Sequence, residues 1–127
     1  MSQQEQEQLI QRYIEAYNLF DVAAMLACLH ENVTFENVSG GEVTIRTEGK
    51  VAFETQARQA VEWFMERCQS IETLRCQNQQ AEADIDFFAI TSVDLPNGIK
   101  AGTILQLTGK SIFTFQGNTI RSIQDIT

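Results

Sequence analysis

The segment from Gln11 to Asn37, QRYIEAYNLFDVAAMLACLHENVTFEN, constrains the fold more than any other part of the chain. Its first half carries apolar residues at helical spacing, and Asp21 then precedes the apolar run VAAMLACL, whose free N–H groups the carboxylate can cap. Residues 33–38 alternate as in a half-buried strand. The segment predicts a helix, a sharp corner, a second helix and a strand. The polar side chains expected to point into an apolar cup are Tyr13, Tyr17 and Asn37.

The rest of the sequence predicts one more helix and a series of strands. A Ser39-Gly40-Gly41 turn leads into EVTIRT, and Glu48-Gly49 opens a third helix whose apolar stripe continues to Cys68. After Ser70 the pattern favours strands at about 71–79, 82–93, 99–108, 109–116 and 118–126. Helices segregated from mostly antiparallel strands predict an α+β domain in which a strongly curved sheet wraps around three helices.

Composition and charge narrow the classes of function. The 127 residues fit a single domain spanning 1–127, and 17 acidic against 9 basic side chains give a net charge of −8, which disfavours nucleic acid and anionic lipid as partners. No apolar run approaches the roughly 20 residues of a membrane span, and MSQQEQEQ does not resemble a signal peptide, so we expect a cytoplasmic protein. The three cysteines and the one histidine have no metal-binding spacing. We therefore expect no metal and no cofactor.

The strand ADIDFFAIT indicates a partner for the outside of the sheet. If Asp84 and Asp86 face water, Phe87 lies on the concave side and Phe88 and Ile90 emerge on the convex side. Exposed aromatic and branched residues on a sheet face usually mean that something covers it. A second copy of the chain is the simplest candidate, so we predict a homodimer through the convex sheet face.

Several local motifs in this order resemble a known superfamily. They are QRYIEAYN, Asp21 at the start of the short helix, ENVTFEN, Gly49 at the start of the third helix, and IFTFQGNTIRSI. Together they resemble the nuclear transport factor 2-like superfamily, which includes the SnoaL-like polyketide cyclases and the ketosteroid isomerases. The resemblance covers nearly the whole chain and implies a cystatin-like cone, with the helices packed inside the curved sheet.

The resemblance to ketosteroid isomerases also implies a site, of which this chain keeps one part. Tyr13 lies where those enzymes have the tyrosine that holds the enolate oxygen, but the position of the base is Asn37 and that of the second acid is Ser111. An amide cannot accept a proton near neutral pH, so steroid isomerisation is disfavoured. Asp125 can supply the missing carboxylate if it shares the inward face of the last strand with Ile123. The competing phase of that strand is Ile120, Ser122, Gln124 and Ile126.

Three functions fit this pattern. The first is an isomerase, cyclase or dehydratase with Asp125 as proton acceptor and Tyr13 as oxyanion donor; the second is a protein that binds a small apolar carbonyl or hydroxyl compound; the third is a dimeric interaction module with a residual cavity. Neutral groups at Asn37 and Ser111 orient a ligand at a lower desolvation penalty than carboxylates, which favours binding slightly over catalysis. The expected ligand contacts are Tyr13, Tyr17, Phe35, Asn37, Trp63, Phe64, Phe87, Ser111 and Phe113. The alternative for the aromatic residues is that they fill a core.

Overall fold

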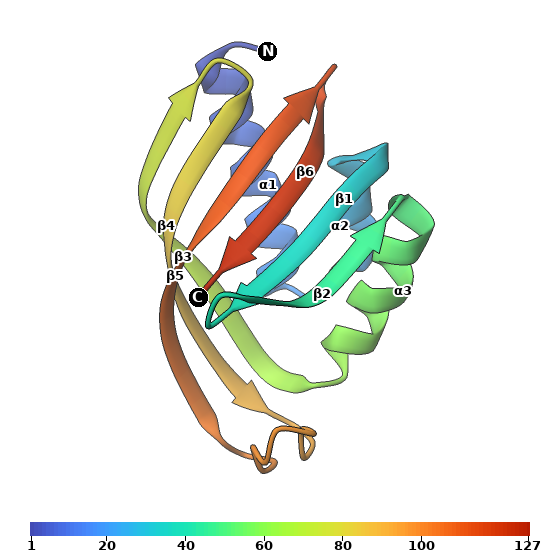
Figure 1. The fold of residues 1–127 in the computed structure, drawn as a ribbon, viewed down its shortest axis with the longest axis vertical. Helices are drawn as coiled ribbons and strands as arrows, with labels where there is room; N and C mark the ends of the chain where they lie inside the picture. Colours follow the sequence, from blue (N-terminus) through green and yellow to red (C-terminus); the bar gives the residue numbers. More distant parts are fainter.

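The computed structural model describes residues 1–127 as three helices and a six-stranded sheet (Figure 1). The helices are α1 (Gln3–Asn18), α2 (Val22–Ala27) and α3 (Lys50–Val61). The strands are β1 (Leu29–Ser39), β2 (Glu42–Glu48), β3 (Phe64–Gln77), β4 (Gln80–Thr91), β5 (Ile104–Gln116) and β6 (Thr119–Ile126). The predicted α+β class, with helices packed on a strongly curved and mostly antiparallel sheet, is confirmed.

The sheet has the strand order β2-β1-β6-β5-β4-β3. Only β1 and β6 run parallel; the other neighbours are antiparallel. In Figure 1, α1 and α2 lie behind the sheet, α3 flanks β1 and β2, and the β4–β5 hairpin extends beyond the ends of β6 and β1. We call the face toward α1 the inner face and the opposite one the outer face. None of the helices has the length and apolar character that a membrane crossing requires.

The helix starts and the corner follow from local chemistry. Ser2 and Glu5 form a reciprocal capping box at the start of α1, with Oγ and Oε1 accepting backbone N–H groups at 3.1 and 2.9 Å. Phe20 takes a left-handed φ of 59°, which turns the chain sharply. Asp21 Oδ1 then accepts the Ala24 N–H at 3.0 Å, so the predicted cap of the second helix is confirmed.

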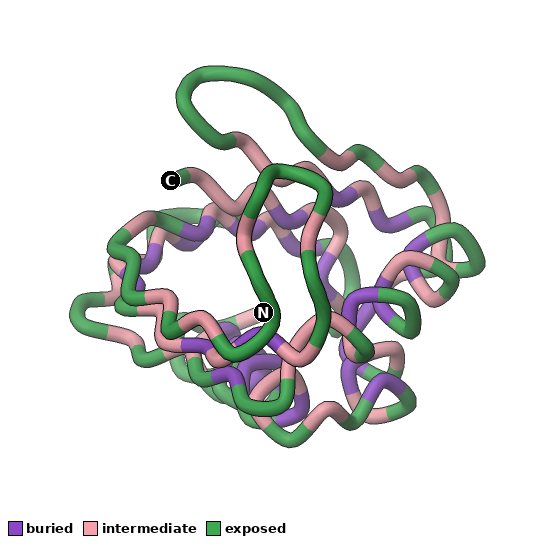
Figure 2. The backbone as a smooth tube through the Cα atoms, turned by 90° about the horizontal axis from the view of Figure 1, so that it is seen from below, coloured by how far each residue is buried: buried purple, intermediate pink, exposed green.

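The core lies between the helices and the inner face of the sheet. Figure 2 shows buried and accessible positions alternating along strands, as expected when successive side chains point to opposite faces. Phe53 of α3 and Phe113 of β5 are fully buried, and the rings of Phe35 and Phe53 meet edge to face with centroids 5.6 Å apart. These contacts hold α3 against β1.

The third helix is shorter than the sequence predicts. It ends at Val61, and the residues from Phe64 to Cys68 belong to β3, where Arg67 pairs with Ala89 and Cys68 with Phe88 of β4. Pairing with a distant strand outweighs the helical spacing of the apolar residues. The sequence had predicted that Cys68 is buried in a helix. That prediction is wrong, because Cys68 is exposed on the sheet. The strands predicted at 99–108 and 109–116 are likewise one strand, β5.

Gly109 lies where β5 continues past the end of β6. A Cβ atom at this position would collide with the backbone carbonyl oxygen of Ile126 and approach the Thr127 side chain at 3.0 Å. Pairing between β5 and β6 begins at Lys110, which is opposite Ile126, and the residues of β5 before Lys110 have no partner on β6. Glycine therefore permits a close backbone approach at the point where the two strands separate.

Replacing Gly109 by alanine should lower the free energy of unfolding by roughly 1–3 kcal/mol, because the added methyl group forces the end of β6 away from β5. Urea denaturation of the full chain measures the effect. Gln116→Ala, an exposed position at the other end of the same strand, is the control and should change stability little. Equal stability of Gly109→Ala and the parent protein would show that the strands do not need this close approach.

Candidate functional site

A cavity of about 230 Å³ opens on the inner face, between the C-terminal end of α1 and the strands β1, β6, β5, β4 and β3. Its lining combines a few polar side chains with apolar ones, as is usual for small-molecule sites. The polar side chains are Tyr17, Asn37, Ser39, Gln69, Thr108, Lys110, Ser111, Asp125 and Thr127, and the apolar ones are Ile85, Phe87, Leu107 and Ile126.

A second hollow, of about 490 Å³, lies at the tip of the β3–β4 hairpin. It is lined by Arg75, Gln77, Asn78, Gln79, Gln80 and Glu82, with no apolar side chain among them. A groove without apolar walls cannot desolvate a small organic ligand, so the smaller cavity inside the cone is the better candidate.

Strand register brings three of the candidate residues into one row. Asp125 of β6 pairs with Asn37 of β1 on one side and with Ser111 of β5 on the other. Ile123 is 2% exposed and Asp125 accepts a hydrogen bond from the buried Ser111, so the inward phase at the end of β6 contains Ile123 and Asp125. Ile120 of the other phase is buried as well, because the pairing with β5 is irregular between Ile120 and Ser122. Gln124 belongs to the opposite phase and donates to Glu36 Oε1 at 3.2 Å. The alternative that the sequence left open is thereby decided.

Asp125 has an unusual environment for a carboxylate. Its half-buried side chain accepts a hydrogen bond from Ser111 Oγ at 2.7 Å. Burial raises the pKa of Asp125 from 3.8 to about 6, and the Ser111 hydrogen bond acts in the opposite direction. The group is thus mainly ionised at neutral pH, yet basic enough to take a proton from a ligand.

Asn37 borders the cavity with part of its hydrogen-bonding capacity already used. Its Nδ2 donates to Thr44 Oγ1 of β2 at 2.8 Å, and the Thr44 hydroxyl donates to the Asn37 carbonyl oxygen at 3.2 Å. The Asn37 Oδ1 atom makes no hydrogen bond within the chain. It remains available as an acceptor.

Tyr17 forms the α1 side of the cavity and is held by β3. Asn18 fixes the helix end, because its Oδ1 accepts the Gln69 N–H at 2.7 Å and its Nδ2 donates to the Gln69 carbonyl at 3.1 Å. The guanidinium carbon of Arg67 lies 3.7 Å from the centre of the Tyr17 ring. Burial raises the Tyr17 pKa to about 12, while the charge of Arg67 lowers it and that of Asp125 raises it.

Tyr13 lies one helical turn away and does not line the cavity. Its side chain is 4% exposed, and its ring meets Phe113 edge to face with centroids 6.2 Å apart. Burial raises its pKa well above the usual range, and the nearby charge of Asp125 adds to the effect. Its role as an oxyanion donor stays a prediction.

The predicted aromatic contacts separate into two groups. Phe35 and Phe113 pack in the core, against Phe53 and Tyr13. Trp63, Phe64, Phe87 and Tyr17 form a continuous row with successive centroids 6.5, 6.1 and 6.5 Å apart. Of that row, Phe87 and Tyr17 line the cavity, and Trp63 and Phe64 continue beyond it.

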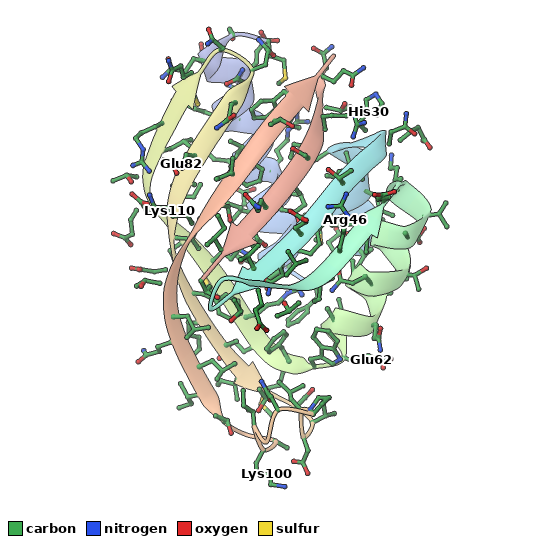
Figure 3. All side chains as sticks on the ribbon, in the orientation of Figure 1. His30, Arg46, Glu62, Glu82, Lys100 and Lys110 are labelled. Carbon is green, nitrogen blue, oxygen red and sulfur yellow. The ribbon has the colours of Figure 1, made fainter.

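The remaining reactive or charged side chains lie away from this cavity or on its rim. His30 is at the opposite end of β1 from Asn37, where its Nδ1 accepts the Asn32 N–H at 2.9 Å (Figure 3). Figure 3 also shows Lys110 beside Glu82, and their Nζ and Oε1 atoms lie 3.6 Å apart on the outer face. Cys28 donates to the Ala24 carbonyl at 3.5 Å and contacts no base.

Two residues of this site were not found by the sequence reasoning, Arg67 and Gln69. Both lie at or just after the end of the segment predicted as the third helix, and in a helix residues two apart do not share a face. In the strand β3, residues 67, 69 and 71 share the inner face. A charged residue on the same face as Ile71 is the feature of the sequence that could have indicated a site.

The comparisons with known proteins agree with the fold. The sequence matches the profile of the SnoaL-like domain over residues 10–123. The chain belongs to the SnoaL-like domain family. The resemblance inferred from the sequence is confirmed. No curated protein matches the sequence of this SnoaL-like protein.

Solved structures share the fold of this SnoaL-like protein at low sequence identity. A proposed polyketide cyclase from Xanthomonas campestris pv. campestris is 21% identical, with a TM-score of 0.82 over 98% of this chain and 90% of that one. A proposed SnoaL-like polyketide cyclase from Shewanella denitrificans is 17% identical, with a TM-score of 0.79 over 98% and 90%. A cystatin-fold protein from Novosphingobium aromaticivorans is 14% identical, with a TM-score of 0.77 over 94% and 96%.

Burial of Asp125 should make the stability of the SnoaL-like protein depend on pH. A folded-state pKa of about 6 against 3.8 means that the folded state holds this proton more tightly, so the free energy of unfolding falls as pH rises through this interval. Asp125→Asn has no carboxyl group to ionise, so its free energy of unfolding should not fall in this way. Between about pH 4 and pH 7, the free energy of unfolding of the variant relative to the parent protein should rise by roughly 2–3 kcal/mol.

Urea denaturation of both proteins at several pH values measures this difference. Asp94→Asn, an exposed aspartate in the loop before β5, is the matched control and should show no such trend. A difference between Asp125→Asn and the parent that does not vary with pH would contradict the burial of this carboxylate.

Proposed function

We propose that this SnoaL-like protein catalyses proton transfer on a small, largely apolar carbonyl compound, with Asp125 as the base. The observation that carries the proposal is that Asp125 is the only carboxylate side chain lining the cavity, with a pKa raised to about 6 by burial. An acid–base group is most effective when its pKa lies near the working pH.

The proposed step is removal of a proton from the carbon next to the ligand carbonyl. The C–H bond breaks and its electron pair forms the C=C bond, the π pair of the carbonyl moves to oxygen to give an enolate, and the proton goes to an Asp125 oxygen. Tyr17, on the α1 wall, is the donor that can hold the enolate oxygen. With a β,γ-unsaturated ketone, return of the proton to the γ-carbon completes an isomerisation; with a second carbonyl in reach, attack by the enolate carbon forms a C–C bond and the resulting alkoxide takes the proton back from Asp125.

Two facts support catalysis over simple binding of the same ligand. An ionised carboxylate in a cavity destabilises the folded protein, and a protein that only binds a neutral compound gains little from it. The neutral Asn37 and Ser111 that favoured binding flank Asp125 and can orient the substrate beside it.

The test needs no knowledge of the natural substrate. Proton abstraction exchanges the acidic C–H hydrogens of a ketone for deuterium in D₂O, and NMR measures the rate. With 2-tetralone and related cyclic ketones as probes, the protein should accelerate exchange, and Asp125→Asn should remove about 10²-fold or more of that acceleration. Retained exchange in a folded Asp125→Asn protein would refute the assignment of the base.

The two tyrosines of the chain provide a matched pair for the donor. Tyr17→Phe should slow exchange, since Tyr17 lines the cavity, whereas Tyr13→Phe should slow it less because Tyr13 does not. The reverse order would assign the donor to Tyr13, as the sequence had predicted.

We also propose that two copies associate through the outer sheet face. Phe88 and Ile90 of β4 share this face with Gln106 and Ile104 of β5, and Ile104 is 61% exposed. Ile112 lies on the same face farther along β5, separated from Ile104 by Gln106, Thr108 and Lys110. Apolar residues adjacent on two neighbouring strands make a self-complementary patch that a twofold-related copy can cover.

Sedimentation equilibrium at micromolar concentration tests the association. The parent protein should be a dimer, and Phe88→Glu combined with Ile104→Glu should be a monomer because each charge would be buried in the interface. Val51→Glu on α3 is the control: this valine is 80% exposed but lies on another surface, so its replacement should leave the dimer intact. A monomeric parent protein would contradict the proposal.

A further inference from the structure

Arg67 is a buried cation with no anionic partner. It lies on the inner face of β3, is 4% exposed, and takes part in none of the ion pairs of the chain. Its Nε atom donates to the Tyr17 carbonyl oxygen at 2.8 Å. Its guanidinium carbon lies 3.7 Å from the centre of the Tyr17 ring and 4.7 Å from that of Phe20. The charge is thus held against the wall of the cavity by aromatic rings.

The donors of this guanidinium are only partly used. Apart from its Nε bond to the Tyr17 carbonyl oxygen, the guanidinium interacts with the Tyr17 side chain, which raises the pKa of Arg67 against the lowering effect of burial. A buried charge that lacks a carboxylate is unfavourable for stability unless other groups compensate for it.

A purely structural role does not account for this arrangement. The end of α1 is already tied to β3 by the two hydrogen bonds between the Asn18 amide and the Gln69 backbone. Asp125 lies across the cavity, and its pKa is set by burial and by Ser111, without a contribution from Arg67. The charge of Arg67 instead acts on the two tyrosines of α1, Tyr17 and Tyr13, and in both it lowers the pKa against the raising effect of burial. Its field is directed at the α1 wall.

We propose that Arg67 is a positioning residue that makes the Tyr17 wall of the cavity selective for a ligand oxygen that carries negative charge, such as a phenolate or an enolate. Arg67 fixes the Tyr17 ring and adds a positive charge directly behind it, so an oxyanion that accepts a hydrogen bond from Tyr17 gains more than a neutral oxygen does.

The inference deepens the proposed function and shares its cavity, but it does not require that Asp125 act as a base. If proton transfer does occur, negative charge leaves the carboxylate and appears on the ligand oxygen near Tyr17. Arg67 then stabilises the enolate more than the ground state, which is the condition for an electrostatic contribution to rate.

Equilibrium dialysis with two probes of similar shape tests the inference. They are 4-nitrophenolate, at a pH where it is ionised, and the neutral 4-nitroanisole. The measurements use the Asp125→Asn protein, so that no carboxylate repels the anion. This protein should bind the phenolate more tightly than the anisole. Arg67→Gln in that background should weaken phenolate binding roughly tenfold and change anisole binding less than twofold.

Arg67→Lys is the charge-retaining variant and should restore part of the preference for the anion, although it cannot stack as a planar guanidinium. An equal loss for both probes would show a structural role, and absence of any preference for the phenolate, or of binding by both probes, would overturn the proposal. Because dialysis measures binding alone and deuterium exchange measures proton transfer, failure of this inference and failure of the proposed function are distinguishable.

Discussion

The register of β6 between β1 and β5 decides what kind of cavity this fold contains. Asp125 pairs with Asn37 on the parallel side and with Ser111 on the antiparallel side, so one carboxylate is flanked by two neutral polar groups. A shift of one residue would turn Gln124 inward and remove the only carboxylate side chain from the cavity. The burial of Ile123 on the same face specifies the register, since slippage would expose it to water.

The shape of the sheet explains why space remains beside Asp125. The strands β4 and β5 continue well past the end of β6, and the close approach of Gly109 to the Ile126 carbonyl marks the point of separation. Beyond this point β5 has no β6 residue beside it, and the C-terminal end of α1 lies over the inner face of the sheet there. The cavity is therefore a consequence of unequal strand lengths, and its walls are residues that also hold the helix to the sheet.

Much of the fold could be predicted because it is determined locally. The cap by Asp21, the alternation of residues 33–38 and the turn at Gly40 and Gly41 depend on near neighbours in sequence. The segment from Phe64 to Cys68 could not be predicted in the same way, because its apolar spacing suits a helix and only its pairing with β4 makes it a strand. Arg67 was missed for that reason. The direction of Asp125 was left open because Ile120, Ile123 and Ile126 give both phases of the last strand an apolar residue.

Asp125 is a half-buried carboxylate with a raised pKa that faces a ligand cavity, and its own titration tests this most directly. NMR can follow the side-chain carboxyl carbon of Asp125 across the acidic range, with Asp125→Asn assigning the signal. A midpoint near pH 6 is the result that the structure predicts. A midpoint near the ordinary value of 3.8 would mean that the carboxyl group is solvated, and it would contradict both the buried site and the proton transfer proposed for it.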